Sequence, residues 1–152
     1  MAKLINPISN ARRDVTPGER RFAKRLETLL EDDYLCWFNV PVGPARHYPD
    51  FLILHPSRGV LLLEVKDWKL ENLRRLDKVS AELIDGNGAV KTVANPLEQA
   101  RSYLLTVVNK LSEDPQLRES SGPYQGKLCF PYGYGVVLTH ITAAMDWMRA
   151  AG

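Results

Sequence analysis

The stretch HYPDFLILHPSRGVLLLEVKDWK, residues 47–69, contains two apolar runs separated by a short segment with Pro56 and Gly59. Proline and glycine in such a segment are typical of a tight turn, so the sequence predicts an antiparallel hairpin. Nearly every position of both runs is apolar, which is typical of strands that are covered on both faces. The hairpin is therefore predicted to form the centre of a sheet with helices on both sides.

Charged residues lie at the open end of this hairpin. If residues 55–59 form the loop, Leu54 lies opposite Val60, and the same register puts Asp50 opposite Glu64. Opposed residues of an antiparallel pair share a face and lie about 5 Å apart. The two carboxylates are then neighbours, whereas a shift of one residue would separate them.

Two adjacent carboxylates repel each other unless a cation joins them. Mg²⁺ typically takes one or two protein carboxylates and completes its shell with water and phosphate oxygens. Lys66 shares a face with Glu64, because side chains alternate along a strand, and can hold a phosphate or orient an attacking water. Asp50, Glu64 and Lys66 thus indicate metal-assisted phosphodiester hydrolysis. The alternative, a solvated strand end with a surface ion pair, stays open.

Two segments outside the hairpin predict amphipathic helices. The first begins at Thr16 and has Glu19 three residues later, the pattern of a capping box. The second begins at Asn95, which Pro96 follows. Further strands are predicted at residues 34–42 and 135–139, and a peripheral hairpin around residues 85–88. The order α-β-β-β-α-β predicts an α/β fold with a mixed central sheet flanked by helices.

The chain length of 152 residues fits one globular domain, which we place at residues 16–152. Residues 1–15 are polar and lack periodicity, so we expect a flexible N-terminal arm. Residues 141–152 begin a helical pattern that no capping or breaking residue ends. We therefore expect the chain to be a piece of a longer protein.

Charge and cysteine content bound the class of protein. The net charge is only +2, from 20 basic and 18 acidic residues, so the overall balance does not indicate a nucleic-acid or membrane partner. The basic pair Arg12-Arg13 is interpreted as solvated surface. Cys36 and Cys129 lie in apolar stretches without the spacing of metal ligands, which predicts buried thiols. No leader segment and no apolar run near the ~18 residues of a membrane span is found, which favours a cytoplasmic protein.

Four segments, GERRFAKRL, HYPDFLIL, GVLLLEVKDWK and NPLEQARSYL, follow one another in this order. The spacing of Pro49-Asp50 and Glu64-Val65-Lys66 resembles the motif of the PD-(D/E)xK nuclease superfamily. Over residues 16–139, the four segments resemble its nuclease-related domain (NERD) family. The resemblance implies a restriction-endonuclease-like core and a nuclease that hydrolyses DNA with Mg²⁺ or Mn²⁺. It also implies a place in a larger DNA-processing or DNA-repair protein, such as a helicase fusion.

The resemblance also implies roles for residues at the hairpin. Asp50 and Glu64 are expected to be metal ligands, together with the carbonyl group of Val65. Lys66 is expected to position or polarise the nucleophilic water. Glu19 matches the first-helix glutamate that often completes the metal site, although it is equally explained as part of the capping box.

Further expected site residues lie on the second helix and beside the hairpin. Gln99 and Tyr103 match a Gln-x-x-x-Tyr motif that in related nucleases lies next to the active site and contacts DNA or the catalytic lysine. Arg101 and Trp68 are candidates for phosphate or base contacts. The alternatives are a boundary glutamine above a half-buried tyrosine, and a tryptophan in the core. His47 is a candidate polar group near the site.

The main prediction is a Mg²⁺-dependent deoxyribonuclease domain, and two alternatives stay open. A non-catalytic module that binds nucleic acid or protein would keep the fold with an incomplete site, whereas Asp50, Glu64 and Lys66 are all present here. A resolvase-like dimer would use the same three residues and differ in its oligomeric state.

Overall fold

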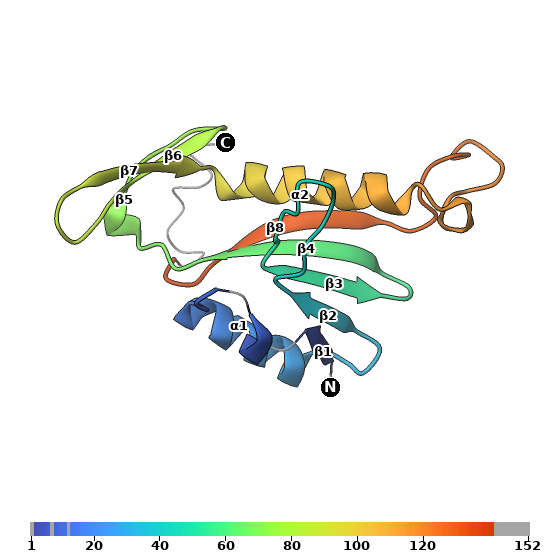
Figure 1. The fold of residues 1–152 in the computed structure, drawn as a ribbon, viewed down its shortest axis with the longest axis horizontal. Helices are drawn as coiled ribbons and strands as arrows, with labels where there is room; N and C mark the ends of the chain where they lie inside the picture. The colour runs from blue at the N-terminus through green and yellow to red at the C-terminus, as the bar shows by residue number, and fades with distance from the viewer. Residues whose placement is uncertain (1, 7, 12, 142–152) are drawn as a thin grey trace.

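The computed structural model describes residues 2–6, 8–11 and 13–141, and it has a central sheet of five strands. They are, in spatial order, β1 (Lys3–Asn6), β2 (Leu35–Phe38), β3 (Phe51–His55), β4 (Gly59–Lys66) and β8 (Tyr132–Leu138) (Figure 1). The pairs β1–β2 and β4–β8 are parallel, whereas β2–β3 and β3–β4 are antiparallel. The predicted mixed sheet is confirmed, although β8 begins earlier than the predicted residue 135.

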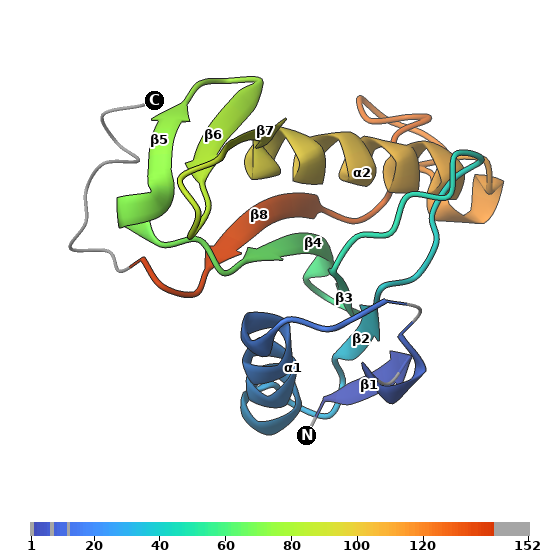
Figure 2. The ribbon, with the colours of Figure 1, turned by 60° about the vertical axis from the view of Figure 1, so that its left-hand side comes forward.

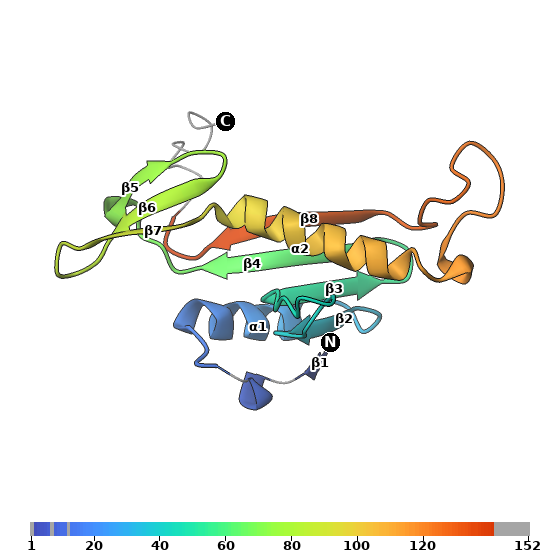
Figure 3. The same cartoon turned by 45° about the horizontal axis from the view of Figure 1, so that its top comes forward.

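Helices α1 (Pro17–Leu29) and α2 (Pro96–Leu111) cover opposite faces of this sheet (Figures 1 and 3). The alternation along β3 explains how one strand serves both helices. Phe51 and Ile53 lie in the hydrophobic core beneath α1, whereas Leu52 packs against the core beneath α2. Strand β3 is therefore covered on both faces, as the sequence predicts, whereas Leu61 of β4 is 39% exposed.

Both helices begin where the sequence predicts. The hydroxyl group of Thr16 accepts a hydrogen bond from the N–H of Glu19 at 3.2 Å, and the Glu19 carboxylate accepts the N–H of Thr16 at 2.9 Å. These reciprocal bonds form the predicted capping box. The side chain of Asn95 accepts the N–H of Leu97 at 2.9 Å and caps α2. The caps fix the N-terminal turns of both helices, from which the site is built.

The hairpin has the predicted register. Leu54 pairs with Val60, and the ladder continues to Phe51 and Leu63. The next pair along the same register is Asp50 with Glu64, just beyond the last ladder pair. The turn chemistry of a short loop was sufficient to predict this register.

The N-terminal segment differs from the flexible arm that we expected at residues 1–15. Lys3–Asn6 forms the edge strand β1, Ala2 is buried in the core beneath α1, and a short 3-10 turn, η1, follows at Ile8–Asn10. A strand of this length has too few residues to show a periodic signal. Its ladder partner β2 lies far along the chain, so only the tertiary structure reveals the pairing.

Strand β2 ends at Phe38, earlier than the predicted end at residue 42. Asn39 has a φ of 54°, a left-handed conformation that does not continue a strand. The segment after it forms one isolated bridge, between Val42 and His47. The connection between β2 and β3 is therefore a loop that leads into Asp50.

A second sheet of three strands connects β4 to α2 (Figure 2). It contains β5 (Leu73–Leu76), β6 (Ser80–Ile84) and β7 (Val90–Ala94) in this order, after a 3-10 turn, η2 (Leu70–Asn72). The turn between β6 and β7 is the predicted peripheral hairpin. Strand β5 was not predicted, because its sequence LRRL does not alternate apolar and polar residues.

Three smaller predictions have mixed outcomes. Cys36 is buried as predicted, but the prediction for Cys129 is wrong, because that residue is exposed in the loop between η3 (Pro115–Leu117) and β8. The helical pattern of residues 141–152 lies outside the described residues, apart from residue 141. Within the described part of the chain, no helix has the length and apolar character that a membrane span requires.

Candidate active site

The predicted site residues of the hairpin and of α1 meet in one cleft of about 480 Å³. It lies where β4 ends, between the first turns of α1 and α2. The lining residues are Arg13, Thr16, Glu19, Tyr48, Asp50, Glu64, Val65, Lys66, Asp67, Trp68 and Gln99. Tertiary structure thus brings together side chains from the N-terminal segment, both helices and the hairpin.

Asp50 and Glu64 lie side by side on the floor of the cleft. The N–H of Asp50 donates a hydrogen bond to Oε1 of Glu64 at 3.2 Å, and Oδ2 of Asp50 accepts the N–H of Val65 at 2.8 Å. Asp50 is 6% exposed and Glu64 is 2% exposed. Pro49, the residue before Asp50, is also fully buried.

Glu19 is the third carboxylate, and it is 2% exposed. Its position at the third residue of α1 follows from the capping box, in which it accepts the N–H of Thr16. The same side chain lines the cleft with Asp50. The capping interpretation of Glu19 is therefore confirmed, and its position also allows the predicted role at a metal site.

Arg13 joins two of these carboxylates, a contact that was not predicted from the sequence. Its Nη2 donates to Oε1 of Glu19 at 2.5 Å and to Oδ1 of Asp50 at 2.7 Å, and its Nη1 donates to Oε2 of Glu19 at 3.0 Å. Arg13 is solvated as the sequence predicts, with its side chain 40% exposed, but its guanidinium group also bridges two buried carboxylates. A lone arginine in a polar segment, 37 residues before Asp50, carries no local signal of this contact.

The ionisation of the carboxylates follows from their surroundings. Burial and the negative charge of Asp50 raise the pKa of Glu64 to about 8. Burial also raises the pKa of Asp50. Burial raises the pKa of Glu19 too, but the hydrogen bonds from Arg13 and Thr16 outweigh it and lower the pKa below its ordinary value. A single guanidinium group therefore does not neutralise the three carboxylates.

The chemistry of the donor set suits a hard divalent cation, although the three carboxylates are not gathered as closely as the ligand atoms of Glu31, Asp33 and His55. Asp50, Glu64 and Glu19 offer carboxylate oxygens, and the carbonyl group of Val65 belongs to the same stretch of cleft wall. Oxygen ligands of this kind suit Mg²⁺ or Mn²⁺ rather than a softer metal. Burial and the negative charge of Asp50 raise the pKa of Glu64, and a cation bound nearby would favour its charged form.

Lys66 is half-buried at the end of β4. Hydrogen bonds connect the end of this strand to α1 and to the residue after β8. The carbonyl group of Lys66 accepts the N–H of Thr139 at 3.1 Å. Asp67 accepts the N–H of Gly18 at 2.9 Å and also the hydroxyl group of Thr139. Burial raises the pKa of Asp67, but these hydrogen bonds outweigh it and lower the pKa. Asp67 was not predicted, because its partners lie on distant segments.

Gln99 reaches the cleft from the first turn of α2. Its Nε2 donates to the hydroxyl group of Tyr103 at 2.8 Å, so the Gln-x-x-x-Tyr pair forms one unit along the helix. The ring of Tyr103 lies 4.8 Å from that of His47, which anchors it from the loop before β3. Gln99 lines the cleft, whereas Tyr103 and His47 do not.

The other two predicted contact residues differ in position. Trp68 lines the cleft with Asp50 and Glu64 and also a neighbouring cleft of about 500 Å³ with Leu97 and Tyr134. Arg101 lines neither cleft, and its guanidinium group makes two hydrogen bonds to Glu98, each 3.0 Å long, on the exposed face of α2. The structure thus brings Trp68 to the candidate site but not Arg101.

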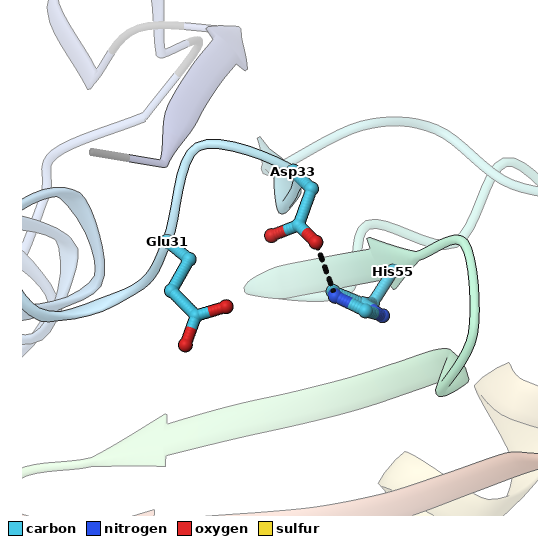
Figure 4. A group of neighbouring side chains, drawn as sticks. All are labelled: Glu31, Asp33 and His55. Atoms are coloured by element: carbon cyan, nitrogen blue, oxygen red, sulfur yellow. Dashed lines mark hydrogen bonds and ion pairs between the residues drawn. The ribbon is translucent and has the colours of Figure 1, made fainter.

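A second group of possible ligands lies at the opposite end of the hairpin (Figure 4). Ligand atoms of Glu31, Asp33 and His55 lie within 4.8 Å of one another. Nε2 of His55 is 2.8 Å from Oδ2 of Asp33, and Nδ1 accepts the N–H of Ser57 at 3.1 Å. Since Nδ1 is an acceptor, Nε2 carries the proton and donates a hydrogen bond to Asp33. This arrangement is an aspartate–histidine pair that fixes the turn.

The sequence model of one family, described as the nuclease-related domain, matches residues 15–131. The chain belongs to the nuclease-related domain family. No curated protein and no solved structure matches the chain. The matched segment of this NERD domain contains Glu19, Asp50, Glu64, Lys66 and Gln99, whereas Arg13 lies before its first residue.

Proposed function

We propose that this NERD domain is a Mg²⁺- or Mn²⁺-dependent nuclease that hydrolyses phosphodiester bonds of DNA. The observation that carries the proposal is the pairing of Asp50 and Glu64 in one cleft with Lys66. Asp50, Glu64 and the Val65 carbonyl group would hold the ion, with Glu19 beside them. When bound, the ion would polarise a phosphate oxygen and lower the pKa of a water molecule.

The protein side chains would then orient the reacting groups. Lys66 carries a positive charge on the same strand face as Glu64, where its ammonium group can hold the attacking water against the phosphate. Gln99 would place its amide group at the cleft wall, with Tyr103 fixing its direction. Trp68 offers an aromatic face on which an unpaired base next to the scissile phosphate can stack.

The low net charge bears on how DNA reaches this site. Phosphate contacts supply most of the sequence-independent affinity for DNA, and a net charge of +2 provides little of it. We therefore propose that the domain acts within a larger DNA-processing protein, in which a fused or associated helicase delivers the DNA. A domain tested alone is then expected to need DNA concentrations well above those of the intact assembly.

The second candidate is a module that binds nucleic acid or protein without cleaving it. A module that does not cleave its partner would not need the buried carboxylate pair. Because burial of two carboxylates lowers stability, such a module would be expected to lack at least one of Asp50, Glu64 and Lys66. All three residues are present and meet in the cleft, which favours hydrolysis.

The test is cleavage of labelled single-stranded and duplex DNA with Mg²⁺, Mn²⁺ or EDTA. Asp50→Asn and Lys66→Ala are each expected to lower the rate roughly 100-fold or more, because each removes a group that acts on the reacting phosphate. Lys69→Ala is the matched control, since Lys69 is exposed just after β4 and does not line the cleft. Folded wild-type protein that cleaves neither DNA, or variants that cleave as fast, would contradict the proposal.

A further inference from the structure

The guanidinium group of Arg13 lies among the oxygens that a divalent ion would use. It bonds Oδ1 of Asp50 at 2.7 Å and both carboxylate oxygens of Glu19, at 2.5 and 3.0 Å. The remaining oxygen of Asp50, Oδ2, already accepts the N–H of Val65. In this arrangement every oxygen of Asp50 and of Glu19 has a hydrogen-bond donor, and for Oδ1 of Asp50 and Oε1 of Glu19 that donor is the charged guanidinium group. An ion at Oδ1 of Asp50 would therefore meet a second cation.

We propose that Arg13 is the resident cation of this carboxylate cluster and sets its affinity for a divalent ion, which binds by displacing the guanidinium group from Asp50. A magnesium ion sits about 2.1 Å from a carboxylate oxygen. With Arg13 still 2.7 Å from the same oxygen, two cations would face each other at short range in a largely buried site. Their repulsion is strong where water is scarce, so occupancy by one disfavours the other.

The guanidinium group can leave without opening the core. The side chain of Arg13 is 40% exposed, whereas those of Glu19 and Asp50 are 3% and 8% exposed. The arginine therefore approaches the carboxylates from the solvent side of the cleft, above the buried floor. Displacement would return the guanidinium group to water, where it is well hydrated, and leave the carboxylates in place.

The displaced residue would also change the N-terminal segment. Arg13 lies between η1 and the cap of α1. Its ion pairs with Glu19 and Asp50 connect this segment to the cleft. Binding of the ion would release that link, while β1 remains paired with β2. The family match begins at residue 15, so this property belongs to a segment that the family assignment does not include.

The test measures the Kd of Mn²⁺ without DNA, by electron paramagnetic resonance of the free ion. Arg13→Gln removes the competing charge and is expected to lower the Kd about tenfold, as expected for the loss of a charge-assisted hydrogen bond to the ligand. Arg20→Gln, on the exposed face of α1, removes the same charge and is expected to change the Kd less than about twofold. An unchanged or higher Kd for Arg13→Gln, or an equal shift for Arg20→Gln, overturns the proposal.

A second variant covers the case in which Arg13→Gln does not fold. A lysine keeps the charge but is a point donor that cannot bridge Asp50 and Glu19 as the guanidinium fork does. Arg13→Lys is therefore expected to lower the Kd by roughly threefold, about half of the free-energy effect of Arg13→Gln. An unchanged Kd for this variant, measured where the far-ultraviolet circular dichroism is that of the wild type, also overturns the proposal.

The proposal rests on the proposed function only for the identity of the ion-binding carboxylates. Since the assay contains no DNA, its outcome is separate from that of the cleavage assay. A protein that does not cut DNA but shows the shift in Kd supports the role of Arg13 and contradicts only the nuclease. A protein that cuts DNA without the shift contradicts only the role of Arg13.

Discussion

Asp50 donates its backbone N–H to the side chain of Glu64, so each carboxylate is tied to the strand that carries the other. The bond crosses the open end of the β3–β4 hairpin, one pair beyond the regular ladder. The position of the carboxylates therefore follows from the register of the sheet and does not depend on a mobile loop. The two backbone hydrogen bonds fix the direction of both carboxylates.

The raised pKa of Glu64 predicts that metal-free protein loses stability as the pH rises. In the folded state burial and Asp50 raise the pKa to about 8, whereas the unfolded chain has the ordinary value near 4.5. Between these values the folded state binds more protons than the unfolded state, so the free energy of unfolding falls with rising pH. We expect a fall of roughly 2–3 kcal/mol between pH 6 and pH 8.5 in EDTA, measured by urea unfolding.

The control for this prediction is Glu64→Gln, which has no titrating carboxyl group at the same place. Its free energy of unfolding is expected to change less over the same pH range than that of the wild type. Equal slopes for the two proteins would show that Glu64 is already ionised at pH 6. Addition of Mn²⁺ should reduce the loss at high pH, because the ion favours the charged carboxylate.

Local signals explain which parts of the fold and site the sequence could predict. The loop between β3 and β4 determined the register, and through it the pairing of Asp50 with Glu64. The caps at Thr16 and Asn95 determined where both helices begin. The caps depend on residues that are close in sequence. The carboxylate pair depends on one turn, which determines which residues of the two strands lie opposite each other.

The parts that were missed depend on contacts between distant segments. Arg13 meets Asp50 only because the N-terminal segment runs past the sheet edge, and Asp67 meets Gly18 only because α1 packs beside the end of β4. Residues 3–6 form strand β1 because they pair with β2. None of these residues has a neighbour in sequence that would reveal its partner, so a single sequence gives no signal for them.

The two roles of Glu19 can be separated by substitution. Glu19→Gln keeps an oxygen that can accept the N–H of Thr16, but it removes the negative charge. If Glu19 is a metal ligand, this variant should bind Mn²⁺ roughly tenfold more weakly. Thr16→Ala removes the cap instead, and should lower the free energy of unfolding by about 1 kcal/mol with little change in Mn²⁺ affinity. If Glu19→Gln leaves the affinity for Mn²⁺ unchanged, Glu19 is a helix cap and not a metal ligand.

Gly18 is required by the close approach of α1 to the end of β4. A Cβ atom at this position would lie 1.7 Å from Oδ1 of Asp67 and 2.8 Å from the methyl group of Thr139. Gly18→Ala is therefore expected to lower the free energy of unfolding by roughly 1–3 kcal/mol, measured by urea unfolding. Gly86→Ala is the matched control, because nothing lies within 4 Å of its Cβ position. Similar losses for both variants would show that the contact between α1 and Asp67 is not tight.

The two cysteines are expected to differ in reactivity. Cys129 is exposed, whereas Cys36 is buried, and burial raises the pKa of its thiol to about 11. Iodoacetamide at pH 8 should therefore modify one thiol in the native protein and both in denaturant, as counted by mass spectrometry. Cys129→Ser should leave the native protein unmodified. Rapid modification of Cys36 in this variant would show that the core beneath α1 opens readily.

Tyr103 is expected to act through Gln99. Tyr103→Phe removes the hydroxyl group that accepts the Gln99 hydrogen bond at 2.8 Å, while the aromatic ring can keep its contact with His47. A neutral hydrogen bond of this kind contributes about 1 kcal/mol, so we expect roughly a fivefold lower rate of DNA cleavage with a nearly unchanged melting temperature. Tyr124→Phe, at an exposed tyrosine far from the cleft lining, should cleave at the wild-type rate. If Gln99→Ala lowers the rate and Tyr103→Phe does not, Gln99 contributes to cleavage without being positioned by Tyr103.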